Sequence, residues 1–154
     1  CRIISSGPVE LVSVVVESEE NRKALLTTQF DVNDVKARIS SSSDKMEGEW
    51  SYLDREIDDN RARLGGRYTL YIVKDGDIYL MLYAGGAVVN ADGWTPMMVK
   101  GVLHPTRFDG HFDLTWYDSL MLPMDDDTFA SVDKEGIMTL DFPFYKSRIR
   151  LYKR

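Results

Sequence analysis

Three side chains that can bind a metal alternate along one short segment: Asp109, His111 and Asp113. In an extended strand, residues two apart point to the same face, so these groups would stand side by side. Carboxylate and imidazole ligands can together hold a divalent metal. The alternate positions, however, carry the apolar side chains Phe108, Phe112, Leu114 and Trp116. We therefore interpret the three polar residues as the solvated face of a strand and predict that they bind no metal.

Other patterns that could support chemistry are weaker. The run Asp125-Asp126-Asp127 is acidic enough to attract calcium. It lacks the spaced carboxylates and the glycine of an EF-hand loop, so a solvated turn is the better interpretation. The sequence contains no Gly-x-Ser-x-Gly, no phosphate-binding loop and no dinucleotide fingerprint. We therefore predict no catalytic residues, no metal and no cofactor.

Composition narrows the class of protein. The chain has 154 residues, of which 44% are apolar and 29% charged, as in an ordinary globular domain. The net charge is -6 and no long basic cluster occurs, which argues against a nucleic-acid partner. No apolar run approaches the roughly 20 residues that a membrane-spanning helix needs.

The first part of the chain, residues 1–46, is predicted to be separate from the rest. A turn-rich tether over residues 1–8 precedes a β-branched run, 9–17, that is typical of a strand. Residues 19–39 have helical periodicity, with Asp31 placed to cap a short helix that begins at Val32. The serines at 40–43 are interpreted as a linker.

Residues 47–154 change to a period of two, which is typical of strands with one buried face. Short segments of this kind are joined by turn signals such as Asp75-Gly76. Eight of them in succession predict a mainly β fold, an antiparallel up-and-down meander that closes into a small barrel. If Leu70, Ile72, Leu80 and Leu82 point inward, three tyrosines point outward and could form a partner surface: Tyr71, Tyr79 and Tyr83. The equal alternative is that these tyrosines cover the N-terminal strand and helix.

The predicted barrel begins with Gly48-Glu49-Trp50, which resembles the Gly-x-Trp signature of the lipocalin and calycin barrels. In that family the tryptophan closes the barrel floor, and an arginine from the last strand packs over its indole. The resemblance therefore implies floor positions for Gly48 and Trp50, with Arg148 and Arg150 as candidates for the arginine. The domain as a whole is similar to small lipocalin-like domains of Bacteroidota lipoproteins.

The first residue, Cys1, resembles the acylated cysteine of a mature bacterial lipoprotein. That resemblance implies a lipid anchor at Cys1 and a place at the outer membrane of the cell envelope. The alternatives are an arbitrary start of the numbering and, much less favoured, an N-terminal nucleophile, which would need an activating base.

Two functions follow as expectations. The first is a non-catalytic envelope lipoprotein that docks as an accessory module on a membrane protein complex. In it, residues 1–18 would lie along the partner, unless they pack back on their own barrel. The second is a carrier of a small apolar ligand. A filled interior favours the module, whereas a cavity of about 300 Å³ or more favours the carrier.

Overall fold

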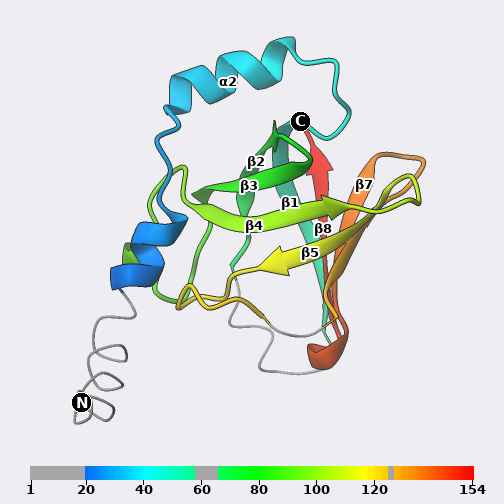
Figure 1. The fold of residues 1–154 in the computed structure, drawn as a ribbon. Coiled ribbons are helices and arrows are strands. Elements are labelled where there is room, and N and C mark those ends of the chain that lie inside the picture. Colours follow the sequence, from blue (N-terminus) through cyan, green and yellow to red (C-terminus); the bar gives the residue numbers. More distant parts are fainter. Residues whose placement is uncertain (1–19, 58–65, 125–126) are drawn as a thin grey trace, which may run out of the picture.

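A computed structural model describes residues 20–57, 66–124 and 127–154, and these form a closed antiparallel barrel in which each strand pairs with the next along the chain (Figure 1). Pairing of the last strand with the first closes the barrel. The strands are β1 (Gly48–Ile57), β2 (Thr69–Asp75), β3 (Ile78–Gly85), β4 (Val99–Pro105), β5 (His111–Trp116), β6 (Phe129–Val132), β7 (Ile137–Phe142) and β8 (Ser147–Lys153). The predicted meander barrel is therefore confirmed. Cys1, the tether and the predicted strand at 9–17 lie outside the described residues.

Alternation of side chains builds the barrel interior. In β7, Met138, Leu140 and Phe142 are buried while the residues between them are only partly so. The inward residues of the eight strands form one apolar cluster. Short 3-10 turns, Ala91–Gly93 and Pro143–Tyr145, lie in two of the loops. No helix among the described residues is long and apolar enough to span a membrane.

The strand predicted to begin at Phe108 begins instead at His111. A turn precedes it, in which Gly110 takes a positive φ of 76° and the Thr106 hydroxyl donates to the carbonyl of His111. Phe108 is therefore 59% exposed and does not join the barrel core. The apolar face predicted for this segment is correct only from Phe112 onward.

Two helical segments precede the barrel, over residues 20–26 and in α2 (Val32–Ser41). Asp31 caps α2, because its carboxylate accepts the backbone N–H groups of Asn33 and Asp34. The predicted linker at 40–43 is wrong in its first half. Ser40 and Ser41 belong to α2, where their hydroxyls donate to the carbonyl of Ala37 in the preceding turn.

Helix α2 covers the outer face of the barrel at β2 and β3 (Figure 1). Its one buried residue, Val35, packs against the outward side chains of Tyr71, Val73 and Leu82. This small second core is separate from the barrel interior, and it makes both faces of these two strands apolar. Because both faces of β2 and β3 are apolar, the alternation of their sequence does not show which face is inward.

Replacing Asp31 by alanine is expected to lower the free energy of unfolding by about 1 kcal/mol. The substitution removes the acceptor for two backbone N–H groups at the start of α2. Denaturant unfolding followed by circular dichroism measures the change. Asp31→Asn is the matched control, because it keeps an acceptor oxygen at the same position. An Asp31→Ala protein as stable as the unchanged chain would contradict the capping role.

A buried cation at the end of the barrel

A local irregularity of β4 turns one charged side chain into the barrel. Met81 pairs with Gly101, but its neighbour Leu82 pairs with Val99, so Lys100 is an extra residue on β4. Such a bulge re-aims side chains. Strict alternation from Gly101 would put Lys100 outside the barrel, yet it is only 1% exposed and lines the interior.

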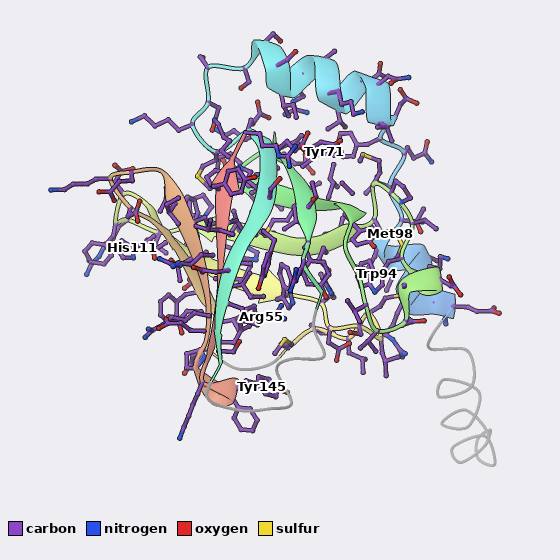
Figure 2. The ribbon with its side chains drawn as sticks, turned by 180° about the vertical axis from the view of Figure 1, so that it is seen from behind. Arg55, Tyr71, Trp94, Met98, His111 and Tyr145 are labelled. Atoms are coloured by element: carbon purple, nitrogen blue, oxygen red, sulfur yellow. The ribbon has the colours of Figure 1, made fainter. Side chains whose placement is uncertain are left out.

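The ammonium of Lys100 lies among three aromatic rings, which we call the aromatic cage: Tyr68, Trp94 and Trp116. Its Nζ is 4.7, 4.4 and 5.0 Å from the respective ring centroids. Nζ also donates to the carbonyl of Tyr117 over 2.6 Å. Ring faces attract a cation, so the aromatic cage partly replaces the water that this ammonium has lost. Figure 2 shows Trp94 on the side of the barrel near the first helical segment.

Burial has a strong effect on the proton affinity of this amine. It lowers the pKa of Lys100 to about 7, against an opposing influence of the Asp118 carboxylate. The Asp118 carboxylate is itself held by the backbone N–H groups of Leu120 and Leu122. No described carboxylate lies within 4.0 Å of the Lys100 Nζ.

A cavity of about 350 Å³ opens beside Lys100, and we call it the end cavity. It lies at the end of the barrel where β7 turns into β8, and Figure 2 shows Arg55 and Tyr145 toward this end. Most of its lining is apolar or aromatic, including Tyr68, Trp116, Phe142, Tyr145 and Ile149. Its charged lining groups among the described residues are Arg55, Lys100 and Asp118. Such a site could hold an apolar ligand and orient it through a few polar groups.

The opposite end of the barrel is closed by Trp50, which is 1% exposed. Its indole Nε1 donates to the carbonyl of Met46 over 2.9 Å. Nearby, the Tyr79 hydroxyl donates to Asp44 over 2.8 Å. Burial and this hydrogen bond raise the pKa of Tyr79 to about 12. A buried Trp50 beside the last strand agrees with the floor position that the Gly-x-Trp resemblance implies.

Glu47 ties α2 to this floor. Its carboxylate accepts from the Ser42 hydroxyl and the Lys74 N–H, both over 2.7 Å, and pairs with Arg38 over 2.8 Å. Burial alone would raise the pKa of Glu47, but these hydrogen bonds and the guanidinium outweigh burial and lower it. The group is therefore structural, and it holds the helix in place over β2 and β3.

The predicted arginine over the Trp50 indole is wrong. Arg148 pairs with Asp141 and Glu56, and Arg150 pairs with Asp54, all on the outer face of the barrel. Both arginines occupy positions opposite to the buried face of β8, so neither can reach an interior indole. The residue of the last strand that pairs with Trp50 in the sheet register is Lys153.

Lys153 crosses the start of the first strand. Its aliphatic stem packs across Gly48, where a Cβ would come within 2.7 Å of Lys153 Cδ. Its Nζ donates to the carbonyls of Lys45 and Glu47. The glycine of the Gly-x-Trp sequence thus leaves room for the Lys153 side chain of the last strand.

The predicted tyrosine surface is also wrong, because all three tyrosines are at least 91% buried. In β3, Tyr79 and Tyr83 point into the barrel, while Leu80 and Leu82 point out. Tyr71 does point outward, but α2 covers it, as Figure 2 shows near the helix. The alternative, in which the tyrosines cover the N-terminal strand and helix, is correct for Tyr71 and the helix, and the strand at 9–17 lies outside the described residues.

Asp109, His111 and Asp113 lie on the exposed side of their segment, as predicted. Figure 2 shows His111 at the periphery, apart from the labelled Arg55 and Tyr145, which line the end cavity. Within the described parts of the chain, no group of three or more His, Cys, Asp or Glu side chains is close enough to hold a metal ion. The prediction that these residues bind no metal remains a prediction.

Sequence reasoning missed Lys100. One signal was available, since Lys100 is a single charge in the apolar segment 97–103. The bulge that turns it inward has no sequence signature of its own. No family model matches the chain, and a search among curated proteins found no similar sequence.

Proposed function

We propose that this protein binds a small, mainly apolar ligand in the end cavity and acts as its carrier. The observation that supports the proposal is the volume of the end cavity, about 350 Å³, together with its aromatic lining. That volume exceeds the roughly 300 Å³ expected of a ligand site. Tyr68 and Trp116 would contact the ligand, and Phe142 and Ile149 would enclose it.

A lipocalin-like identity belongs to this proposal. It is supported by the up-and-down barrel, by Trp50 at the closed end and by Gly48 under the last strand. A lipid anchor at Cys1 would hold such a carrier at the outer membrane of a bacterial envelope. The anchor lies outside the described residues, so it stays a prediction from sequence.

The accessory-module function has lost one of its supports, because the three tyrosines predicted to point outward are buried. Its other supports, which are Cys1, the tether and the missing catalytic set, remain predictions. No contact among the described residues favours docking on a membrane protein complex over ligand carriage. The carrier is therefore the function that we test.

Binding of the neutral fluorescent probe N-phenyl-1-naphthylamine tests the carrier proposal. We expect a saturable rise in its fluorescence and displacement by decan-1-ol. Ile149→Phe, which places a larger side chain against the end cavity, is expected to weaken binding at least tenfold. Leu53→Phe is the matched control, because Leu53 is 43% exposed and does not line the end cavity.

Two results would overturn the proposal. One is the absence of saturable binding by the unchanged protein. The other is equal affinity for the probe in Ile149→Phe and Leu53→Phe when both variants unfold cooperatively. Thermal unfolding of each variant supplies that check on folding.

A further inference from the structure

Exposed apolar side chains gather at one end of the barrel. Successive connections of an up-and-down barrel alternate between its two ends, so three of them share the end that holds the end cavity: β3–β4, β5–β6 and β7–β8. Each of these three carries at least one large apolar side chain that is 43–66% exposed. We call this set the apolar rim, and its members are Val88, Leu120, Leu122 and Phe144.

The apolar rim borders the mouth of the end cavity. Leu120 lines the end cavity, and so do Val89 and Tyr145, which are the sequence neighbours of Val88 and Phe144. The apolar rim therefore meets solvent around an opening whose interior is itself mostly apolar.

The turn 118–122 holds two of these side chains in solvent. The Asp118 carboxylate accepts the backbone N–H groups of Leu120 and Leu122, and the Asp118 N–H donates to the Leu122 carbonyl over 2.8 Å. Met121, between the two leucines, is buried. The turn thus buries one apolar residue and fixes two others in water, which is unfavourable unless something covers them.

The first helical segment, 20–26, lies at the same end. The guanidinium Nε of Arg22 donates to the Leu120 carbonyl over 2.9 Å, and Leu25 in this segment is exposed. Figure 1 shows the segment beside the loops at the end of the barrel away from α2. Residues 1–19 lead into it, so a lipid anchor at the predicted site, Cys1, would join the barrel at the end that bears the apolar rim.

Lipid explains this arrangement better than a folded partner does. Apolar side chains on separate connections around an opening offer a protein no continuous core, whereas fluid acyl chains can enclose each of them separately. Phe144, Tyr145 and Lys146 also follow one another in the order apolar, amphipathic and basic. The rings of Phe144 and Tyr145 are in contact, with centroids 5.0 Å apart, and Lys146 is exposed. Such a segment suits the boundary between acyl chains and phosphate head groups.

We propose that the apolar rim docks this protein on a lipid bilayer, with Leu120, Leu122 and Phe144 inserted among the acyl chains. Burial of apolar surface drives the docking. Electrostatic attraction does not, because the net charge of -6 disfavours the anionic lipids that would supply it. The inference goes beyond the carrier function and holds whether or not the end cavity takes up a ligand.

Flotation with phosphatidylcholine vesicles tests the docking, with the full chain free of acyl groups. We expect the unchanged protein to float with the vesicles and to stay bound when sodium chloride is added, because salt screens charges and not apolar contacts. Phe144→Asp and Leu120→Asp should each weaken binding roughly tenfold or more, since each removes one apolar side chain from the bilayer. Phe108→Asp is the matched control, because Phe108 is 59% exposed but lies in the β4–β5 turn at the opposite end. Thermal unfolding of each variant checks that it is folded.

A tryptophan reporter distinguishes insertion from adsorption. The three native tryptophans are buried, so an added one can be compared with them as a constant background. Phosphatidylcholine brominated on its acyl chains should quench the added fluorescence of Phe144→Trp. It should leave that of Phe108→Trp unchanged.

Four results would overturn the inference. They are no flotation of the unchanged protein, its release from vesicles by salt, equal vesicle binding by Phe144→Asp and Phe108→Asp, and equal quenching of the two tryptophan variants. A dimer that Leu120→Asp converts to a monomer, without vesicle binding, would instead identify the apolar rim as a contact between two copies of the chain. Failure of N-phenyl-1-naphthylamine to bind would overturn the carrier function and leave the docking inference standing.

Discussion

Replacing Trp50 by alanine is expected to lower the free energy of unfolding by about 3–5 kcal/mol. Trp50 is 1% exposed at the closed end of the barrel. Alanine would remove the indole from the core and leave a void that the closed barrel can fill only in part. It would also leave the carbonyl of Met46 without the indole N–H that donates to it.

Urea unfolding followed by far-ultraviolet circular dichroism measures this loss. Phe144→Ala is the control for removing an aromatic ring, because Phe144 is 64% exposed. A surface truncation of that kind is expected to change stability by no more than about 0.5 kcal/mol. Similar unfolding midpoints for the two variants would show that Trp50 does not hold the barrel floor together.

Replacing Lys100 by methionine is expected to raise the free energy of unfolding of the ligand-free protein, whereas Trp50→Ala lowers it. Replacing a buried ion by an apolar side chain of similar volume is often neutral or stabilising, by about 1–4 kcal/mol. Methionine would avoid the desolvation that lowers the pKa of Lys100 to about 7. It would lose the contacts with the aromatic cage and with Tyr117, which offset part of the gain.

The pH dependence identifies the cause of this stabilisation. An unfolded lysine keeps its proton up to about pH 10, whereas folded Lys100 releases its proton at about pH 7. Between these values the unfolded state binds more protons, so the free energy of unfolding rises with pH. The slope is at most about 1.4 kcal/mol per pH unit. Lys100→Met should lack this rise, and its advantage should shrink from pH 7 to pH 9.5.

Urea midpoints at several pH values between 6 and 9.5 measure this slope. The raised pKa values of Tyr68 and Tyr79 act above that range, where unfolded tyrosines ionise. Lys134→Met is the control, because Lys134 is exposed in the turn between β6 and β7. It should keep the slope of the unchanged protein. A Lys100→Met protein that is less stable at every pH would mean that the aromatic cage outweighs the cost of burying the charge.

Local features of the sequence were sufficient to predict the strands and their order in the barrel. The segments of β7 and β8 alternate strictly, so their bounds follow from the period of two. The short connection between them requires antiparallel pairing. Asp31 was predictable as a helix cap for a similar reason, because capping depends on neighbouring residues only. Trp50 was placed at the floor through its family resemblance.

The faces of β3 could not be read from its sequence. A period of two identifies the buried face only when the other face is polar. In β3 both faces are apolar, because α2 covers the outer one. The structure shows that the inward residues are Tyr79, Met81 and Tyr83. Met81 pairs with the inward Ile72 of β2, and this pairing decides which face of β3 is inward. Whether a tyrosine forms a surface or a core depends on the element packed over it.

The arginines of β8 show the reverse case, in which the local pattern was the better guide. Ile149 and Leu151 alternate with Arg148 and Arg150, so buried aliphatic residues already required the arginines to point outward. The family resemblance instead implied that one of these arginines packs over the Trp50 indole. The structure pairs them with acidic residues of the neighbouring strands β1 and β7.

The sequence by itself determined a closed meander of short strands and a capped helix, whereas a family resemblance suggested the position of Trp50. Only the tertiary structure placed Lys100 inside the barrel and shaped the end cavity. The physical reason is that a bulge depends on the pairing of two strands, here Met81 with Gly101 and Leu82 with Val99. The aromatic cage likewise joins Trp116 of β5 to Tyr68, just before β2, and to Trp94, in the connection between β3 and β4, and these residues approach one another only when the barrel closes.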